Sequence, residues 1–308
     1  MKKKTLHKAV LNLFLSFLLA LLLVLDTALA IAFSGPINPD FLKTLVDETG
    51  LAETAQEYIA RQFADQCISS GFEENFVKTL ADAETIRSDM HGEIDWMFGG
   101  EGRFNRTAFK KELSSRLLRQ VEAMGEEATP ETKENIYEMC DTLGTIYKAS
   151  ITFPFEQTLR APYRLLYANR WLILACFGLF TLFLVWFLYW LNHRQGRARE
   201  QIQYAVITAA LVPLIPGISL SCSGLLSNLL LPNPVTREIF AGTGRMLEQG
   251  MLLAGAVFAG SGVLLALTAP RRRGEPLPAQ GQDSGSDVFE DLKAIRSECS
   301  APPEKTEN

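Results

Sequence analysis

The sequence predicts an all-α membrane protein with four transmembrane helices and an extracytoplasmic helical bundle inserted between the first and the second. Three observations support this fold class. Charged residues crowd into residues 34–170 and the C-terminal tail, whereas other long stretches are almost free of charge. Hydrophobic residues within 34–170 recur at helical spacing, without useful strand-like alternation. Basic residues flank alternate apolar stretches, which indicates one orientation in a bilayer.

The first apolar stretch lies in residues 1–33, behind a lysine-rich start. About 20 apolar residues cross a hydrocarbon core roughly 30 Å thick, so this stretch is long enough to anchor the chain. It also resembles a signal peptide, because Ala28-Leu29-Ala30 matches a cleavage pattern. The uninterrupted apolar run from Ala9 to Leu25 is long for a signal peptide, so we favour an uncleaved anchor.

The predicted external domain, residues 34–170, is acidic and helical. It has 15 Lys/Arg against 23 Asp/Glu, a net charge of −8, which argues against nucleic-acid binding. Asn38-Pro39-Asp40 and Thr129-Pro130 are typical of helix starts, in which a capping side chain precedes a proline. The predicted helices cover about residues 39–50, 51–69, 72–80, 83–98 and 107–124, with a last one after Thr129-Pro130.

Three further spans are predicted in residues 171–270. Residues 171–191 carry no charge and have Trp171 at one end and Tyr189-Trp190 at the other, where membrane interfaces favour such rings. The third stretch covers about residues 204–231 and the fourth about 251–269, joined by a charge-balanced loop at 232–249. The tail, residues 271–308, has the Pro-, Gly-, Ser- and acid-rich composition of a disordered segment.

Basic residues predict the orientation of the chain. Lysines precede the first span, a basic loop at 193–199 joins the second and third, and Arg271-Arg272-Arg273 follows the fourth. Because basic loops face the cytoplasm, we expect a multi-pass cell-membrane protein with both termini in the cytoplasm and residues 34–170 outside.

The cysteines of the external domain, Cys67 and Cys140, leave two alternatives. Outside the cytoplasm a disulfide between them is permitted. Both also fit as small buried side chains on helices.

The sequence contains no recognisable catalytic, cofactor-binding or metal-binding pattern. Zinc-protease, paired C-x-x-C, phosphate-loop and nucleophile-elbow motifs are all missing. The strongest metal candidate combines Asp89, His91, Glu93 and Asp95, but only Asp89 and Glu93 would share a helical face. We therefore expect a solvated acidic face, with no metal, no cofactor and no enzymatic activity.

Five residues of the apolar stretches are candidates for function. Asp26 is the only acidic residue within such a stretch, and intramembrane ionisable residues often have functional roles, although Asp26 also lies near enough to the outer interface to reach it. Pro213, Pro216 and Gly217 interrupt the third stretch, and Asn228 follows. They indicate either a discontinuous helix that lines a solute path or a kinked helix packed by small residues.

Small residues in the fourth stretch, such as Gly255 with Ala259, Ala256 with Gly260 and Gly262 with Ala266, allow close helix packing. This packing serves either the bundle itself or a homo-oligomer, and the sequence does not separate the two.

Two motifs carry a resemblance to a known group of proteins. Asn38-Pro39-Asp40-Phe41 follows the first span, and residues 88–100, SDMHGEIDWMFGG, form an acidic helix with an aromatic-glycine end. The chain thereby resembles uncharacterised four-span membrane proteins of Gram-positive bacteria, over most of residues 1–270. It departs from them in its long acidic tail and its proline-containing third stretch. The resemblance implies the same architecture and no known activity.

Together these features favour a non-enzymatic integral membrane protein whose external domain senses or binds a partner or envelope component. The alternative is a small transporter or channel subunit that uses the third span. Expected partners are the lipid bilayer and a protein partner or a second copy of the chain.

Overall fold

The structure is a computed structural model that describes residues 2–154, 156–192, 198–226, 228 and 230–268. Its described residues form helices and connecting loops without a strand, which confirms the all-α prediction. Residues Met1–Ala266 form one compact unit. The tail predicted to be disordered, the basic loop residues 193–197 and the arginines 271–273 lie outside the described residues.

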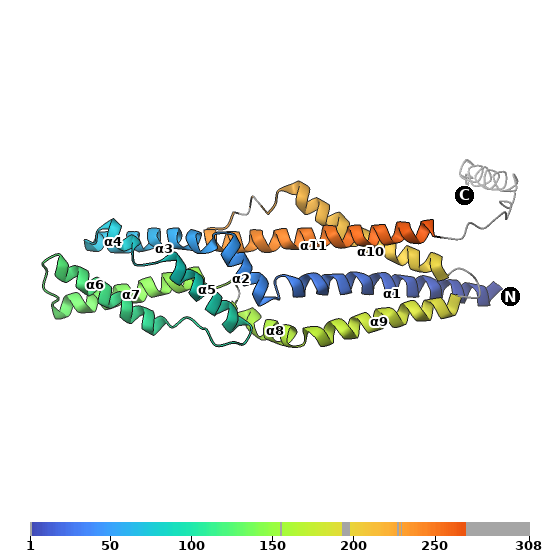
Figure 1. Cartoon of the computed structure of the whole chain (residues 1–308), viewed down its shortest axis with the longest axis horizontal. Helices are drawn as coiled ribbons and strands as arrows, with labels where there is room; N and C mark the ends of the chain where they lie inside the picture. Colours follow the sequence, from blue (N-terminus) through green and yellow to red (C-terminus); the bar gives the residue numbers. More distant parts are fainter. Residues whose placement is uncertain (1, 155, 193–197, 227, 229, 269–308) are drawn as a thin grey trace, which may run out of the picture. The chain divides into compact units, whose positions relative to one another are not determined.

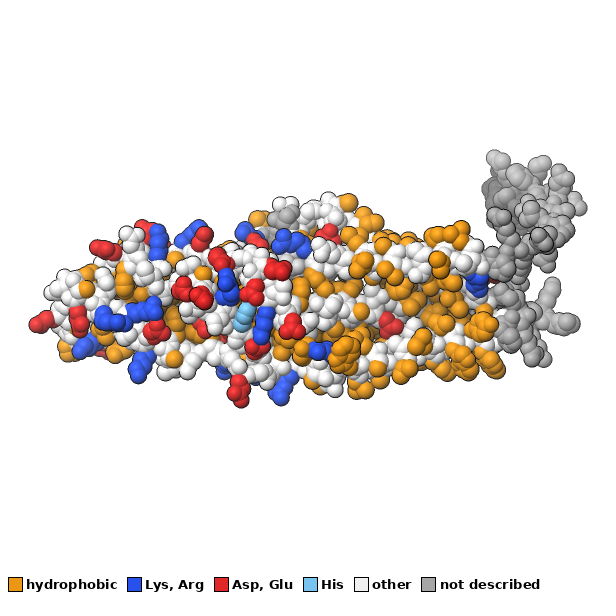
Figure 2. All heavy atoms as spheres, in the orientation of Figure 1, with side chains coloured by type: hydrophobic (Ala, Val, Ile, Leu, Met, Phe, Trp, Pro, Cys, Tyr) orange, Lys and Arg blue, Asp and Glu red, His pale blue; other side chains and the backbone are white. Residues whose placement is uncertain are grey.

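Four helices are long and apolar enough to cross a membrane, as predicted. They are α1 (Lys2–Ser34), α9 (Arg170–Asn192), α10 (Ala198–Ser223) and α11 (Pro234–Leu267). Hydrophobic side chains cover these helices, whereas charged side chains gather over the elements between α1 and α9 (Figure 2). The four helices are thus compatible with an integral membrane protein.

Helix α1 lies between α9 and α10 and packs against both of them (Figure 1). Leu19 of α1 and Leu188 of α9 are fully buried in this contact, together with Ala205 of α10. Large apolar side chains on the outer faces of the same helices stay exposed, as expected for surfaces that meet lipid.

Residues between α1 and α9 form a helical domain, here called the acidic domain, in the predicted place along the chain. Its helices begin where capping residues allow: the Asn38 side chain accepts a hydrogen bond from the Asp40 amide, and the Thr129 side chain accepts one from the Thr132 amide. The helices are α2 (Pro39–Glu48), α3 (Leu51–Cys67), a 3₁₀ turn (Ile68–Ser70), α4 (Glu74–Lys78), α5 (Ala83–Met97), α6 (Arg106–Ala123), α7 (Pro130–Ile151) and α8 (Glu156–Ala168).

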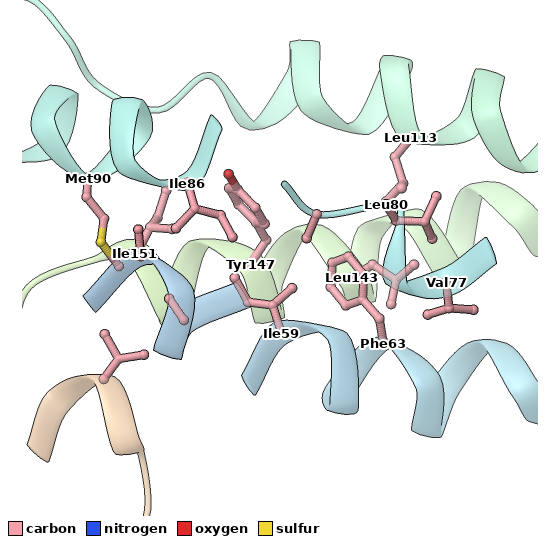
Figure 3. Close-up of a cluster of buried hydrophobic side chains, with 14 of the residues drawn as sticks. Ile59, Phe63, Val77, Leu80, Ile86, Met90, Leu113, Leu143, Tyr147 and Ile151 are labelled. Atoms are coloured by element: carbon pink, nitrogen blue, oxygen red, sulfur yellow. The ribbon is translucent and has the colours of Figure 1, made fainter. Parts of the chain in front are cut away.

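The core of the acidic domain forms where α3, α5 and α7 meet (Figure 3). Ile59 and Phe63 from α3 and Ile86 from α5 pack against Leu143 and Tyr147 from α7. All five side chains are at most 1% exposed, so the domain has a hydrophobic core of its own.

Helix α11 corrects the prediction of a loop at residues 232–249. The helix starts at Pro234 and runs without interruption to Leu267. The Asn233 side chain accepts hydrogen bonds from the Val235 and Thr236 amides, so Asn233-Pro234 is a helix start of the same kind as Asn38-Pro39. The balanced charges of residues 232–249 therefore lie mainly on the first part of helix α11, rather than on a loop between two spans.

The first turns of α11 belong to the core of the acidic domain. Val235 and Ile239 are 2% and 8% exposed and join the same buried cluster as the side chains of α3, α5 and α7. A Cβ on Gly242 would lie 2.4 Å from the Leu45 side chain of α2, so glycine allows the close approach of these helices. One continuous helix therefore connects the core of the acidic domain to an apolar segment long enough to cross a membrane.

Replacing Ile239 with Ala is expected to lower the stability of the acidic domain by about 2–3 kcal/mol, because it leaves a cavity in the shared core. Phe240→Ala is the matched control, since the neighbouring Phe240 is 40% exposed. Thermal unfolding is followed by reaction of the buried thiols Cys67 and Cys140 with a fluorogenic dye, in a protein whose other cysteines are replaced by Ser. Equal melting temperatures for the two variants would show that α11 is not part of this core.

Candidate functional site

The acidic domain buries two carboxyl groups next to each other. Glu93 lies on α5 and is 1% exposed, and Glu156 is the first residue of α8 and is 5% exposed. Asp and Glu are almost never buried to this extent without a cationic or hydrogen-bonding partner. The Oε2 atoms of both residues nevertheless have no hydrogen-bond partner among the described residues. We refer to Glu93 and Glu156 as the carboxyl pair.

Glu93 holds the loop 99–105 against α5. Its Oε1 atom accepts a hydrogen bond from the Phe104 amide at 2.9 Å. The loop lies very close to α5, because a Cβ on Gly92 would lie 2.4 Å from the Gly102 carbonyl oxygen, and one on Gly102 would lie 2.8 Å from that of Gly92. Residues 99–102 therefore form a loop whose glycines permit contact with a helix.

Glu156 lies near enough to Glu93 for the two carboxyls to affect each other's charge. Burial, and to a smaller extent the negative charge of Glu93, raise the pKa of Glu156 to about 7. Lys148 and Arg103 oppose this increase through their positive charges. Glu156 is thus protonated below neutral pH and loses its proton as the pH rises through about 7.

Trp96 connects the three segments around the carboxyl pair. The guanidinium of Arg160, from α8, lies 3.7 Å from the Trp96 ring centroid, and that of Arg103, from the loop, lies 4.7 Å from it. Arg160 also donates from Nε to the Trp96 carbonyl oxygen at 3.3 Å. These cation–π contacts hold α8 and the loop on the same part of α5.

The four residues considered as a metal site turn to separate partners. Only Glu93 points into the carboxyl pair, and the others interact with three different elements, so the prediction of a solvated acidic face is only partly right. Within the described residues no group of three His, Cys, Asp or Glu side chains is placed to hold a metal ion. The contacts are Asp89 with Tyr147 Oη (2.7 Å), His91 Nε2 with Asp47 (3.1 Å) and Asp95 with Lys43 Nζ (2.7 Å).

Asp26 connects two of the candidate spans. Its Oδ2 atom accepts a hydrogen bond from the Thr181 hydroxyl of α9 at 2.7 Å, and Thr181 is 8% exposed. Toward the other end of α1, Ser16 donates to Gln201 of α10 at 2.7 Å, and Asn12 and Asn192 donate to each other at 2.8 and 3.1 Å. Asp26 is thus one of several polar residues with which α1 binds its neighbours.

The residues singled out in and after the third span lie in different surroundings. Helix α10 continues through both Pro213 and Pro216. Pro213 and Gly217 are buried, whereas Pro216 is exposed. Asn228 lies beyond the end of the helix and is exposed.

Glycines allow α10 and α11 to pack through interlocking side chains. A Cβ on Gly217 of α10 would lie 3.2 Å from Leu252 of α11, and one on Gly255 of α11 would lie 2.3 Å from Leu214 of α10. Gly262 faces α10 in the same way, whereas Gly260 has no neighbour within 4 Å among the described residues. Of the small residues predicted in the fourth span, Gly255 and Gly262 therefore pack within the chain.

Cys67 and Cys140 are free thiols in the core of the acidic domain. Both are fully buried, Cys67 on α3 and Cys140 on α7. Burial raises the pKa of Cys67 to about 11 and that of Cys140 to about 12. Of the two alternatives left by the sequence, the structure contains the small buried side chains.

The carboxyl pair was missed by the sequence analysis. Glu93 was grouped with its neighbours along α5, and Glu156 was not singled out, because nothing in a sequence brings residues so far apart together. Pro154, two residues before Glu156, is a residue type often found near helix starts.

Comparisons with protein-family models, with curated proteins and with solved structures find no match to this chain. The resemblance to four-span membrane proteins of Gram-positive bacteria rests on the quoted residues alone. The function must therefore be argued from the geometry of the chain itself.

Replacing Thr181 with Val is expected to weaken the contact between α1 and α9 by about 1 kcal/mol, a typical value for a hydrogen bond between membrane helices. Thr181→Ser keeps the hydroxyl and is expected to retain most of the stability. The measurement is unfolding of the purified protein by SDS in mixed micelles. Equal losses for Val and Ser would show that the bond to Asp26 contributes nothing.

Cys67 and Cys140 are expected to resist alkylation in the folded protein, because the thiolate is the reactive form and burial disfavours it. Iodoacetamide at pH 8, followed by peptide mapping with mass spectrometry, is expected to modify both residues only after denaturation. A cross-linked peptide containing both cysteines, recovered from protein prepared without reductant, would contradict this expectation.

Proposed function

We propose that the chain is a non-enzymatic integral membrane protein whose acidic domain lies outside the cytoplasm and senses or binds a partner or envelope component. The observation that carries this proposal is the continuous helix α11. Its first turns are buried in the core of the acidic domain, and its later residues form one of the four candidate spans. A domain built into its membrane helices in this way is suited to passing on a change of state.

Coupling between distant sites travels through packed side chains and rigid helices. Three such connections join the acidic domain to the candidate spans: α1 leads into α2, α8 leads into α9, and α11 enters the core. Binding on the surface of the domain would therefore act on more than one span at once.

The proposed orientation has both termini in the cytoplasm, and its support is the basic residues that flank alternate spans. An uncleaved first helix is part of the proposal. The hydrogen bonds of Asn12, Ser16 and Asp26 to α9 and α10 support its retention, because cleavage near Ala30 would remove all of them.

A non-enzymatic role is supported by the sequence, which has no catalytic pattern, and by the separate partners of the residues around His91. Exposed apolar side chains on the acidic domain offer contact points for a protein or an envelope polymer. They include Ile68 and Tyr137, each 49% exposed.

A photo-crosslinking residue placed at Ile68 or Tyr137 is expected to capture a specific partner in intact cells. The control position is Leu253 of α11, which is 68% exposed and is expected to meet lipid. Captured proteins are identified by mass spectrometry.

Labelling of a cysteine placed at the exposed Ser70 by a membrane-impermeant maleimide in intact cells tests the external location separately. Failure to capture any specific species at Ile68 and Tyr137 under several growth conditions would count heavily against the binding role.

A further inference from the structure

We propose that the carboxyl pair makes the docking of α8 on α5 dependent on a proton, so that the acidic domain responds to external pH. A proton on Glu156 leaves only one buried negative charge in the pair while α8 is docked, and loss of this proton releases the start of α8 and the loop 99–105. This inference rests on the proposed sensing role, and it identifies the proton as the signal that the domain senses.

The geometry of the carboxyl pair disfavours ionisation of both carboxyls at once. Both carboxyls are buried, Glu156 lies within reach of the charge of Glu93, and the Oε2 atom of each has no hydrogen-bond partner among the described residues. Two ionised carboxylates in contact repel strongly in a medium of low dielectric constant. The docked arrangement therefore favours a protonated Glu156.

Charged groups reach Glu156 from each element around it. Glu93 comes from α5, Lys148 from α7 and Arg103 from the loop, and Arg160 lies on α8 itself. Lys148 and Arg103 attract the ionised form from a distance, but neither donates a hydrogen bond to the free carboxylate oxygen. Arg160 is directed to Trp96. Ionisation of Glu156 thus leaves a second buried negative charge without a direct partner.

Helix α8 is the element that can relieve this repulsion most easily. Glu156 is its only buried residue, whereas α3 and α7 each bury several. Its other contacts with α5 and the residue after it include Arg160 on Trp96 and the partly buried Tyr163, which stacks on Phe98. Water can therefore reach the carboxyl pair after a small movement of the start of α8, without disruption of the main core.

The loop 99–105 is connected to the same event through Glu93. The Glu93 Oε1 atom accepts a hydrogen bond from the Phe104 amide. The guanidinium groups of Arg103 and Arg160 both contact the Trp96 ring. Figure 1 shows α8 beside α5 and continuing toward α9, from which one residue separates it. Movement at the start of α8 is thus placed to alter the entry of the chain into α9.

The direction of the pH dependence follows from the two states of Glu156. In the docked state its pKa is about 7, whereas a carboxyl released to water titrates near the ordinary value of 4.5. The docked state binds the proton more tightly, so docking is favoured at acidic pH and is lost as the pH rises through about 7. Between pH 6 and pH 8.5 the docking equilibrium is expected to fall about tenfold.

Hydrogen exchange on the full chain in lipid nanodiscs tests the proposal at pH 6 and pH 8.5, with rates corrected for intrinsic exchange. Protection of the amides in 99–105 and 157–161 is expected to fall about tenfold at the higher pH. Glu156→Gln is expected to keep its protection within about twofold across this range, because the amide does not titrate. Glu101→Gln, at an exposed position of the same loop, is expected to retain the tenfold change.

Glu93→Gln provides a second variant, in which the amide can donate to an ionised Glu156 and the pH response is expected to shrink. Equal wild-type protection at the two pH values would overturn the proposal, as would a full pH response in both Gln variants of the pair. These outcomes concern local exchange in purified protein, so they are distinct from the crosslinking result. If no partner is captured but protection of the loop depends on pH, the proposed binding role is contradicted and the proposed proton response is retained.

Discussion

The contact of α1 with α9 and α10 is the interaction on which the rest of the structure depends. Lipid offers no hydrophobic driving force between membrane helices, so their association requires close packing and interhelical hydrogen bonds. Helix α1 supplies both, through fully buried Leu19 and through the hydrogen bonds of Asn12, Ser16 and Asp26. Because α1 leads into the acidic domain and α9 leaves it, this contact brings the two ends of the domain together.

Helix α11 packs against the other helices in a different way, through close contacts at glycines. Glycines at 217 and 255 let leucine side chains of α10 and α11 enter the opposite helix surface, and Gly242 admits Leu45 of the acidic domain. The same helix therefore packs against a candidate span along one part and against helices of the acidic domain along another. Its two surroundings explain why a single helix contains both the balanced charges near Arg237 and the apolar run after Met251.

Sequence patterns predicted the elements that depend on local chemistry. Apolar length identified four spans, and the starts of α2 and α7 followed from Asn38-Pro39 and Thr129-Pro130. The same signal at Asn233-Pro234 was overlooked, because the charges that follow it were interpreted as a loop between spans. The carboxyl pair could not be predicted, since burial of Glu93 and Glu156 results from the tertiary contact of α5 with α8 and has no periodic signature.

Burying two carboxyls is costly in free energy, and an apolar pair of similar volume would often be at least as stable. The cost falls where α8 meets α5, and Glu156 is the only buried residue of α8. An unfavourable contact between Glu93 and Glu156 weakens the packing of α8 but leaves the main hydrophobic core of the domain in place. Since α8 is also the segment that leads into α9, the carboxyl pair lies at the start of a connection between the acidic domain and the candidate spans.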